Sequence, residues 1–214
     1  IVLQTVRDAL SRGAAVLKEA GIERPAHEAA LLLSRAEGLR KEELYARTTD
    51  PISPAGAREY EEYLNLRSRG TPIGYIMGEK EFYGRLFRTD PRALIPRPDT
   101  EILVERAIEI ARKLAEQRDH RQAVRIHDCC TGTGCIPITI ALELAERRAG
   151  EFEVSGSDLS EAALSLAREN ADRLAPGLVS FRRQDLLSET AAGSYDLITA
   201  NPPYLTSRET IDAL

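Results

Sequence analysis

Apolar residues recur at helical spacing through the first third of the chain. From about residue 5 to residue 66 they return every three or four positions, as expected for helices with one buried face. Gly21 is suited to end one of these helices, and Pro25 is suited to the first turn of the next. The pattern predicts an all-α domain over residues 1–70 that offers no catalytic residues and serves for packing or for docking a partner.

Glycines and prolines then interrupt short aromatic and β-branched runs over residues 71–98. Such punctuation predicts a hairpin or an extended linker between two domains. Apolar residues return to helical spacing from about Thr100 to Gln117, where they share one face. A helix is therefore predicted directly after the linker.

The second half of the chain alternates short β-rich runs with helical patterns. Strands are predicted over residues 123–130, 152–158, 178–187 and 195–204, and helices over residues 136–149 and 160–175. Strands that alternate with helices of this length form βαβ units with right-handed crossovers and a parallel sheet. The fold class predicted for residues 99–214 is therefore α/β, a doubly wound, Rossmann-like sheet.

Composition and charge narrow the classes of function. The chain has 214 residues, 43% of them hydrophobic, and a net charge of -5. These values suit one or two soluble domains and oppose binding of nucleic acid through its phosphates. No apolar run reaches the roughly 20 residues of a membrane span, and no signal pattern opens the chain. We therefore expect a cytoplasmic protein, or a mitochondrial matrix protein in a eukaryote, without membrane or direct nucleic-acid contact.

Three cysteines fall within a short stretch, at Cys129, Cys130 and Cys135. They invite a metal or disulfide interpretation, but neither a Cys-x-x-Cys pair nor a histidine at ligand spacing accompanies them. We interpret the three cysteines instead as small residues that line a tight loop. We expect no metal site.

Polar residues end the predicted strands. Asp128, Asp158, Asp185 and Asn201 each stand at the carboxyl end of one strand, and these ends meet at one edge of a parallel sheet. Asp and Asn also favour turns, so each residue alone has a plain explanation as a surface turn residue. The four together favour a ligand site at this edge.

A glycine-rich turn, "DCCTGTGCIP", joins the first of these strands to its helix. Gly132 and Gly134 allow a sharp turn and a close backbone approach to a ligand, and Asp158 stands where such folds bind ribose hydroxyls. The turn lacks the spacing and the lysine of a phosphate-binding loop. An adenosine-containing ligand without pyrophosphate is therefore favoured, and S-adenosylmethionine is the obvious candidate.

Two stretches of the chain resemble a known family. "NPPY" ends the last apolar strand, as in methyltransferases that act on planar amino groups, and "TPIGYIMGEKEFYGRLFRTDPRALIPRPDTE" spans the linker. The longer stretch is similar to the HemK/PrmC family, the protein-(glutamine-N5) methyltransferases of peptide release factors. The resemblance covers nearly the whole chain. It implies a class I S-adenosylmethionine-dependent methyltransferase that acts on the Gly-Gly-Gln glutamine of class I peptide chain release factors and leaves S-adenosylhomocysteine.

The resemblance also implies roles for the residues that match the family motifs. The turn from Cys130 to Gly134 would line the methionine part of the cofactor, Asp158 would bind the ribose, and Asp185 with Leu186 would bind the adenine. The implied cofactor-binding residues are Asp128, Cys130, Thr131, Gly132, Thr133, Gly134, Asp158, Asp185, Leu186 and Asn201. The substrate amide would lie against Asn201, Pro202, Pro203 and Tyr204, of which the catalytic residues are Asn201, Pro202 and Tyr204.

Two positions depart from the family pattern. Glycine is usual at the position of Cys130, and an aromatic residue is often present at that of Leu186. The first change leaves less room beside the cofactor, and the second weakens stacking on the adenine. Neither change removes a group that methyl transfer requires.

The turn at Asn201 has a physical explanation in this chemistry. Pro202 and Pro203 cannot continue a strand, so the strand must stop at Asn201. An amide nitrogen is a weak nucleophile because its lone pair is delocalised into the carbonyl. If the Asn201 oxygen and the Pro202 carbonyl accept its N–H groups, its lone pair can point at the methyl group while Tyr204 stacks on the amide.

Two other functions stay open on the sequence. An exocyclic amine of adenine or cytosine in nucleic acid is a second acceptor, although 5% aromatic residues and a negative charge oppose base extrusion. A non-catalytic protein that binds the cofactor or a partner is the third hypothesis. We expect a monomer. Because sheets of this family usually carry more strands than the pattern predicts here, we also expect the methyltransferase domain to be incomplete at Leu214.

Overall fold

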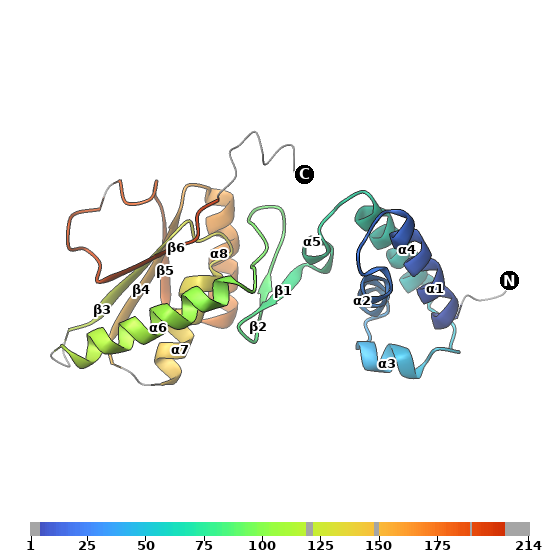
Figure 1. The fold of residues 1–214 in the computed structure, drawn as a ribbon, viewed down its shortest axis with the longest axis horizontal. Helices are drawn as coiled ribbons and strands as arrows, with labels where there is room; N and C mark the ends of the chain where they lie inside the picture. The colour runs from blue at the N-terminus through green and yellow to red at the C-terminus, as the bar shows by residue number, and fades with distance from the viewer. Residues whose placement is uncertain (1–4, 119–121, 148–149, 189, 204–214) are drawn as a thin grey trace. The chain divides into compact units, whose positions relative to one another are not determined.

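A computed structural model of the chain describes residues 5–118, 122–147, 150–188 and 190–203. The chain divides into two compact units, Ile1–Met77 and Gly78–Leu214 (Figure 1). Among the residues in these described ranges, none of the helices combines the length and the apolar character that a membrane span requires.

The first unit is a bundle of helices. Thr5 begins its first helix by accepting a hydrogen bond from the Asp8 N–H, and Pro25 opens its second helix, as predicted. The helices are α1 (Val6–Glu19), α2 (Pro25–Glu37), α3 (Lys41–Ala46), α4 (Pro54–Ser68) and α5 (Ile73–Met77). Gly13 lets α4 approach α1, because a Cβ at this position would collide with the Tyr60 hydroxyl. The largest buried side chains of this unit are Leu17, Leu32, Leu33, Leu44 and Tyr60.

The segment predicted as a hairpin or extended linker contains both a helix and a hairpin. Residues 73–77 form the short helix α5, which begins where the Pro72 carbonyl accepts hydrogen bonds from the N–H groups of Tyr75 and Ile76. The hairpin follows in the second unit, where β1 (Glu79–Phe82) pairs antiparallel with β2 (Arg85–Arg88). The glycines and prolines of the sequence therefore did not exclude a short helix before the hairpin.

The second unit is built on a parallel sheet. Its strands are β3 (Val124–Cys129), β4 (Phe152–Asp158), β5 (Val179–Arg183) and β6 (Leu197–Ala200). They lie in the order β5-β4-β3-β6, and each neighbouring pair is parallel (Figure 1). The helices are α6 (Thr100–Glu116), α7 (Cys135–Glu146) and α8 (Glu161–Leu174). The predicted parallel α/β sheet is confirmed.

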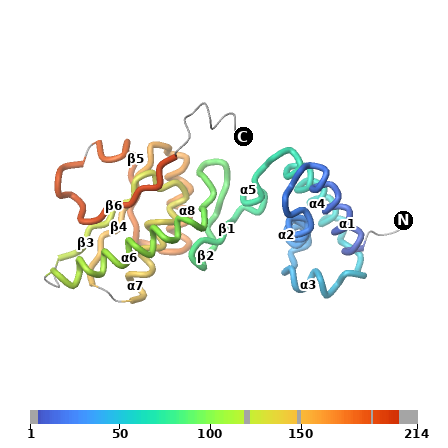
Figure 2. Tube along the Cα trace, viewed as in Figure 1, coloured from blue at the N-terminus to red at the C-terminus, as the bar shows by residue number. Residues whose placement is uncertain are grey.

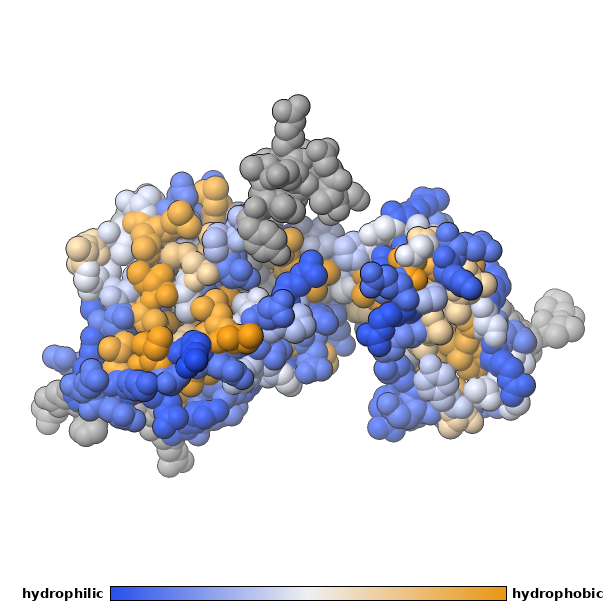
Figure 3. Space-filling view, viewed as in Figure 1, coloured by the Kyte–Doolittle hydropathy of each residue, from blue (hydrophilic) through white to orange (hydrophobic). Residues whose placement is uncertain are grey.

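The side chains of alternate strand residues point to the two opposite faces of this sheet. Val124, Ile126 and Val154 pack into one hydrophobic core with α6, α7 and α8, and α6 passes beside β3 and β6 (Figure 2). The helices of the described residues thus cover one face, whereas a doubly wound sheet has helices on both. Apolar side chains remain exposed on α6 and β6, where Figure 3 shows hydrophobic surface and where Ile102 and Ile198 are 64% and 45% exposed.

The opposite face of the sheet carries polar side chains. His127 is buried there, with its ring stacked on Tyr195 at 4.3 Å between ring centroids. Its ring nitrogens lie 2.8 Å and 2.9 Å from the hydroxyl oxygens of Ser155 and Ser157. Burial lowers the pKa of His127 to about 4. The ring is therefore neutral at pH 7 and has satisfied partners, as expected for a histidine without a catalytic role.

Candidate active site at the carboxyl edge of the sheet

The carboxyl ends of the strands gather predicted site residues at one edge of the sheet. Cys129 ends β3 and pairs with Ser157 of β4 and Ala200 of β6. Asp158 is the last residue of β4, and Asn201 directly follows β6. The parallel register therefore places Asp158 and Asn201 on either side of the turn that leaves β3.

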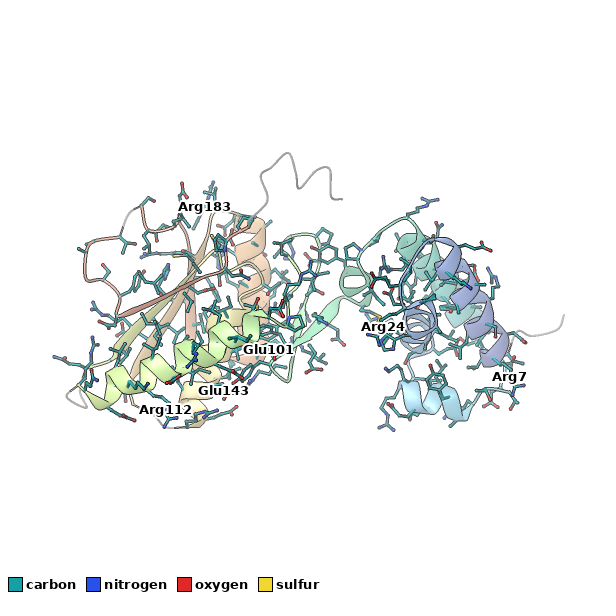
Figure 4. All side chains as sticks on the ribbon, in the orientation of Figure 1. Arg7, Arg24, Glu101, Arg112, Glu143 and Arg183 are labelled. Carbon is teal, nitrogen blue, oxygen red and sulfur yellow. The ribbon has the colours of Figure 1, made fainter. Side chains whose placement is uncertain are left out.

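Asp185 lies beyond the end of β5, which is shorter than predicted. The strand ends at Arg183, labelled in Figure 4, and the following Gln184 N–H donates to the Asp158 carbonyl at 3.1 Å. This hydrogen bond keeps the chain beside β4 for one more residue. Leu186 then adopts a φ of 48° and turns the backbone, so Asp185 stands in a bend at the same edge rather than in the strand.

Backbone hydrogen bonds fold the glycine-rich turn against β4. The Thr131 N–H donates to the Ser157 carbonyl at 2.9 Å, and the Gly134 N–H donates to the Thr131 carbonyl at 2.8 Å. The Gly132 N–H donates to Oδ2 of Asp158 at 2.9 Å. The acid predicted to bind ribose is thus joined directly to the turn predicted to line the cofactor.

At two positions where this turn packs against β4 and α8, only glycine leaves enough room. Gly134 has a φ of 79°, and a Cβ there would lie 3.1 Å from the Cβ of Ala167 in α8. The sequence pattern did not single out Gly156 of β4, where a Cβ would lie 2.9 Å from Oγ1 of Thr131. Both glycines let the turn lie close to the elements behind it.

Asp128 is buried inside β3 and not exposed at the edge. Its Oδ1 accepts a hydrogen bond from the Thr199 hydroxyl at 2.7 Å. Its Oδ2 and the neighbouring Oγ1 of Thr131 are buried without a hydrogen-bond partner among the residues that the structure describes. Burial raises the pKa of Asp128 to about 7. Thr199 was missed by the sequence analysis, although a threonine within an apolar strand was the available signal.

The two departures from the family pattern share an unusual backbone conformation. Cys130 and Leu186 have φ values of 57° and 48°, in the left-handed region that disfavours residues with a side chain. Glycine fits this region without strain, which explains why it suits the Cys130 position. The Leu186 side chain is 53% exposed, so it is available to a ligand beside Asp185.

Asn201 is held by a residue that the sequence analysis did not assign to the site. Its Nδ2 donates to Oγ1 of Thr100 at 3.2 Å. Thr100 is buried at the start of α6, and its N–H donates to the Arg97 carbonyl at 3.1 Å. With Nδ2 engaged by Thr100, the Oδ1 oxygen of Asn201 is left to accept a hydrogen bond from a substrate. Thr100 belongs to the family-like stretch "LIPRPDTE", which was the available signal.

Exposed prolines follow Asn201 at the same edge. Pro202 and Pro203 are both exposed, and neither has an N–H to bond elsewhere. Tyr204 lies outside the described residues, so its predicted stacking on the substrate amide stays a prediction. The structure brings together the glycine-rich turn, Asp158 and Asn201, and it places Asp185 in the next bend along the edge.

The cysteines of this region are thiols without metal-ligand geometry. Within the described ranges, no group of three or more His, Cys, Asp or Glu residues is placed to hold a metal ion. Burial raises the pKa values of Cys129, Cys130 and Cys135, the last of them to about 12. The three thiols are therefore neutral at pH 7, with Cys129 at the end of β3, Cys130 in the turn and Cys135 at the start of α7.

A parallel sheet with this glycine-rich turn and this acidic strand end defines a Rossmann-like α/β protein, and two family models identify its type. The PrmC N-terminal domain matches residues 8–78, and the methyltransferase small domain matches residues 105–214. The second model covers most of the Rossmann-like unit. The chain is therefore a class I methyltransferase in its second unit.

Similarity to curated relatives identifies the particular family of this methyltransferase. Release factor glutamine methyltransferases from Moorella thermoacetica, Chlorobaculum tepidum and Bacillus subtilis are 35%, 37% and 34% identical to this chain. The matches cover 94%, 96% and 98% of this chain and 67%, 69% and 70% of the relatives. The chain belongs to the release factor glutamine methyltransferase family.

Solved structures with a similar backbone are more distant. A class I S-adenosylmethionine-dependent methyltransferase from Listeria monocytogenes is 16% identical, with a TM-score of 0.43, over 98% of this chain and 62% of that chain. A ribosomal protein L11 methylase from Lactobacillus delbrueckii is 23% identical, with a TM-score of 0.39, over 57% of this chain and 56% of that chain.

Proposed function

We propose that this chain transfers a methyl group from S-adenosylmethionine to the side-chain amide nitrogen of the Gly-Gly-Gln glutamine in a class I peptide chain release factor. Family membership supports the reaction, since the relatives are named release factor glutamine methyltransferases. The observation that carries the proposal is Asn201, which bonds Thr100 through Nδ2 and leaves Oδ1 at the carboxyl edge for the acceptor amide.

The residues at this edge fit S-adenosylmethionine. The carboxylate oxygens of Asp158 accept the N–H groups of Gly132 and Ser160 at 2.9 Å and 3.0 Å, and each keeps a lone pair for a ribose hydroxyl. Exposed Leu186 offers an apolar surface to adenine. The cofactor, when bound, supplies a methyl group activated by a positively charged sulfur.

The protein has to make a planar amide nitrogen nucleophilic. In the proposed site, Oδ1 of Asn201 and the carbonyl of Pro202 accept the two N–H groups of the glutamine amide. These bonds favour a pyramidal nitrogen whose lone pair is directed at the methyl group rather than into the amide. Because Pro202 and Pro203 have restricted backbones, the accepting carbonyl stays in place. Alignment of this kind supplies several powers of ten in rate.

A strong general base is not needed for this transfer. The nitrogen–methyl bond forms as the methyl–sulfur bond breaks, which leaves a neutral thioether and a positively charged nitrogen. The nitrogen then loses a proton to water. The neutral, fully engaged His127 on the polar face of the sheet agrees with this scheme.

The partner, the assembly and the location are further parts of the proposal. The helical unit, with its own core and without catalytic residues, is proposed to dock the release factor. We propose that the protein acts as a monomer in the cytoplasm. Its net charge of -5 supports a protein partner over a polyanionic one.

Transfer of labelled methyl from S-adenosylmethionine to three acceptors tests the proposal. The acceptors are a class I release factor, the same factor with its Gly-Gly-Gln glutamine replaced by alanine, and DNA in duplex and single-stranded forms. We expect label on the intact release factor only. Label on DNA would indicate a nucleobase amine as acceptor, and tight cofactor binding without any label would indicate a binding protein.

A further inference from the structure

One buried amide joins the hairpin to the glycine-rich turn. Asn170 lies in α8 with its side chain fully buried. Its Oδ1 accepts the Arg88 N–H at 2.8 Å, and its Nδ2 donates to the carbonyls of Arg88 at 3.1 Å and Thr133 at 3.0 Å. Arg88 ends β2, and Thr133 lies between the two glycines of the turn. A single side chain therefore bonds three backbone groups from two separate segments.

Only a side-chain amide satisfies this arrangement. The Arg88 N–H requires an acceptor, whereas the carbonyls of Arg88 and Thr133 both require donors. An aspartate in place of Asn170 has nearly the same shape but would turn a carboxylate oxygen toward both carbonyls. The exchange of the Asn170 amide for a carboxylate therefore breaks the link to the turn while it preserves the packing.

The segment that follows β2 lies against the same turn. Arg92 donates to Glu169, the residue before Asn170, at 2.6 Å and 3.0 Å, and it also donates to Asp90 at 2.7 Å. The Cβ of Ala93 lies 3.8 Å from the place of a Cβ on Gly132. Residues 88–93 are thus held by α8 on one side and adjoin the turn on the other.

We infer that Asn170 is a positioning residue that fixes the glycine-rich turn in its cofactor-binding shape. This inference rests on the proposed function, because it takes the turn as the S-adenosylmethionine site. The turn contains Cys130 in a left-handed conformation, which a residue with a side chain holds only with support from its surroundings. Asn170 supplies that support by fixing the Thr133 carbonyl, so the turn is ordered before the cofactor arrives and binding loses less entropy.

The test measures binding of S-adenosylhomocysteine to the full chain by calorimetry. Asn170→Asp is expected to raise the Kd about tenfold, the effect of losing the hydrogen bond to the Thr133 carbonyl, and to raise the cofactor KM to the same extent. At saturating cofactor, kcat should change by less than about twofold, because the acceptor site around Asn201 is untouched. Amide hydrogen exchange should become faster in residues 130–134 and 88–93.

Leu174→Ala is the matched control. Leu174 lies one helical turn beyond Asn170 in α8 and packs on the hydrophobic core of the sheet, so its truncation lowers stability without touching the turn. We expect an unchanged Kd and unchanged exchange in residues 130–134. If both variants raise the Kd equally for an equal loss of thermal stability, Asn170 acts only through the fold and the inference is overturned.

Glu169→Gln keeps the inference testable if Asn170→Asp does not fold. Glu169 is partly exposed, and the change weakens the attachment of Arg92 and the longer ion pair with Arg88 at 3.9 Å, so a rise in Kd of about twofold to threefold is expected. Where Asn170→Asp does not fold, an unchanged Kd for Glu169→Gln would overturn the inference alone; where it folds, an unchanged Kd for Asn170→Asp would do so. Absence of S-adenosylhomocysteine binding to the wild-type chain would overturn the proposed function as well.

Discussion

The two ends of the parallel sheet hold carboxylates in opposite environments. At the amino end, Asp196 precedes β6 and accepts hydrogen bonds from Nη1 of Arg118 at 2.9 Å and from the backbone N–H of Arg125 at 2.9 Å. The Arg125 side chain also donates to Asp196 at 3.2 Å. Hydrogen bonds from Arg118 and Arg125 hold the pKa of Asp196 well below its usual range.

At the carboxyl end, Asp128 is more deeply buried and has less support. Thr199 donates to one of its oxygens, and the other has no partner among the residues described. Burial raises its pKa to about 7, in the direction opposite to that of Asp196. The comparison teaches that two arginines keep the carboxylate at the amino end charged, whereas burial near the carboxyl end favours the protonated form of Asp128.

The largest effect is expected from Asn201→Ala at the carboxyl end. The change should lower kcat for release-factor methylation by about 100-fold to 1,000-fold, the range for loss of one preorganised hydrogen-bonding group. Asn201 is exposed, so the free energy of unfolding should change by less than about 0.5 kcal/mol. Labelled methyl transfer and denaturant unfolding of the same preparation measure the two quantities.

Thr100→Val refines this prediction. Valine keeps the shape of threonine but removes the hydroxyl that receives Nδ2 of Asn201, so kcat should fall about tenfold, and Thr100→Ser should restore much of the rate. Transfer at the wild-type rate by Asn201→Ala would mean that the chemistry does not occur at the carboxyl end.

A smaller effect is expected from Asp158→Asn. The carboxylate accepts the N–H groups of Gly132 and Ser160, and loss of its charge weakens both these bonds and the bonds proposed to ribose. We expect the Kd of S-adenosylhomocysteine to rise about tenfold to 100-fold, as for hydrogen bonds to a charged group. Asp172→Asn makes the same change of charge on an exposed site of α8 and should leave the Kd unchanged. Equal Kd values for the two variants would contradict the ribose role of Asp158.

The sequence predicted the elements of the second unit better than their ends. The helix expected over residues 100–117 is observed as Thr100–Glu116. Its buried face contains Val104, Ala107 and Ile108, whereas Ile102 and Ile110 of the apolar pattern are exposed. The strand expected over residues 178–187 ends at Arg183. Apolar composition alone could not show that Leu186, three residues beyond the end of this strand, takes a left-handed conformation that turns the backbone.

The residues at strand ends were predictable, whereas their supports were not. Asp158 and Asn201 stand at the ends of predicted strands, and strand ends of a parallel sheet meet at one edge, so their proximity follows from topology. The Thr100 contact with Asn201 and the Asn170 contacts with Arg88 and Thr133 join segments far apart in sequence. Such pairings depend on packing, which no local pattern encodes.

At the amino end, Asp196→Asn tests stability rather than activity. The change leaves two arginines without their partner, and we expect a loss of about 2 kcal/mol in the free energy of unfolding at pH 7. Because the folded pKa of Asp196 is lowered from 3.8, its contribution is present above that pH and is lost as the pH falls toward the folded pKa. Denaturant unfolding between pH 3 and pH 7 measures this, and methyl transfer should be unaffected where the variant is folded.

Glu109→Gln is the matched control for Asp196. Glu109 pairs with Arg106 and Lys113 on the exposed surface of α6, so its loss should cost less than about 0.5 kcal/mol. A cost for Asp196→Asn no greater than that of Glu109→Gln would show that the amino end is not the more stabilised of the two.

The smallest effect, with the opposite sign, is expected from Asp128→Asn. The folded pKa of Asp128 is raised from 3.8 to about 7, so between these values the folded chain keeps a proton that the unfolded chain releases. Wild-type stability due to this group therefore falls as the pH rises through this window and is constant above it. The variant lacks this titration, so its free energy of unfolding relative to the wild type should rise by at least about 1 kcal/mol between pH 4 and pH 8. The buried donor that its amide leaves unpaired lowers its stability equally at both pH values. Unfolding at pH 4 and pH 8 measures this rise. A relative stability that does not rise would show that Asp128 is charged in the folded chain as Asp196 is, and the contrast between the two ends of the sheet would not hold.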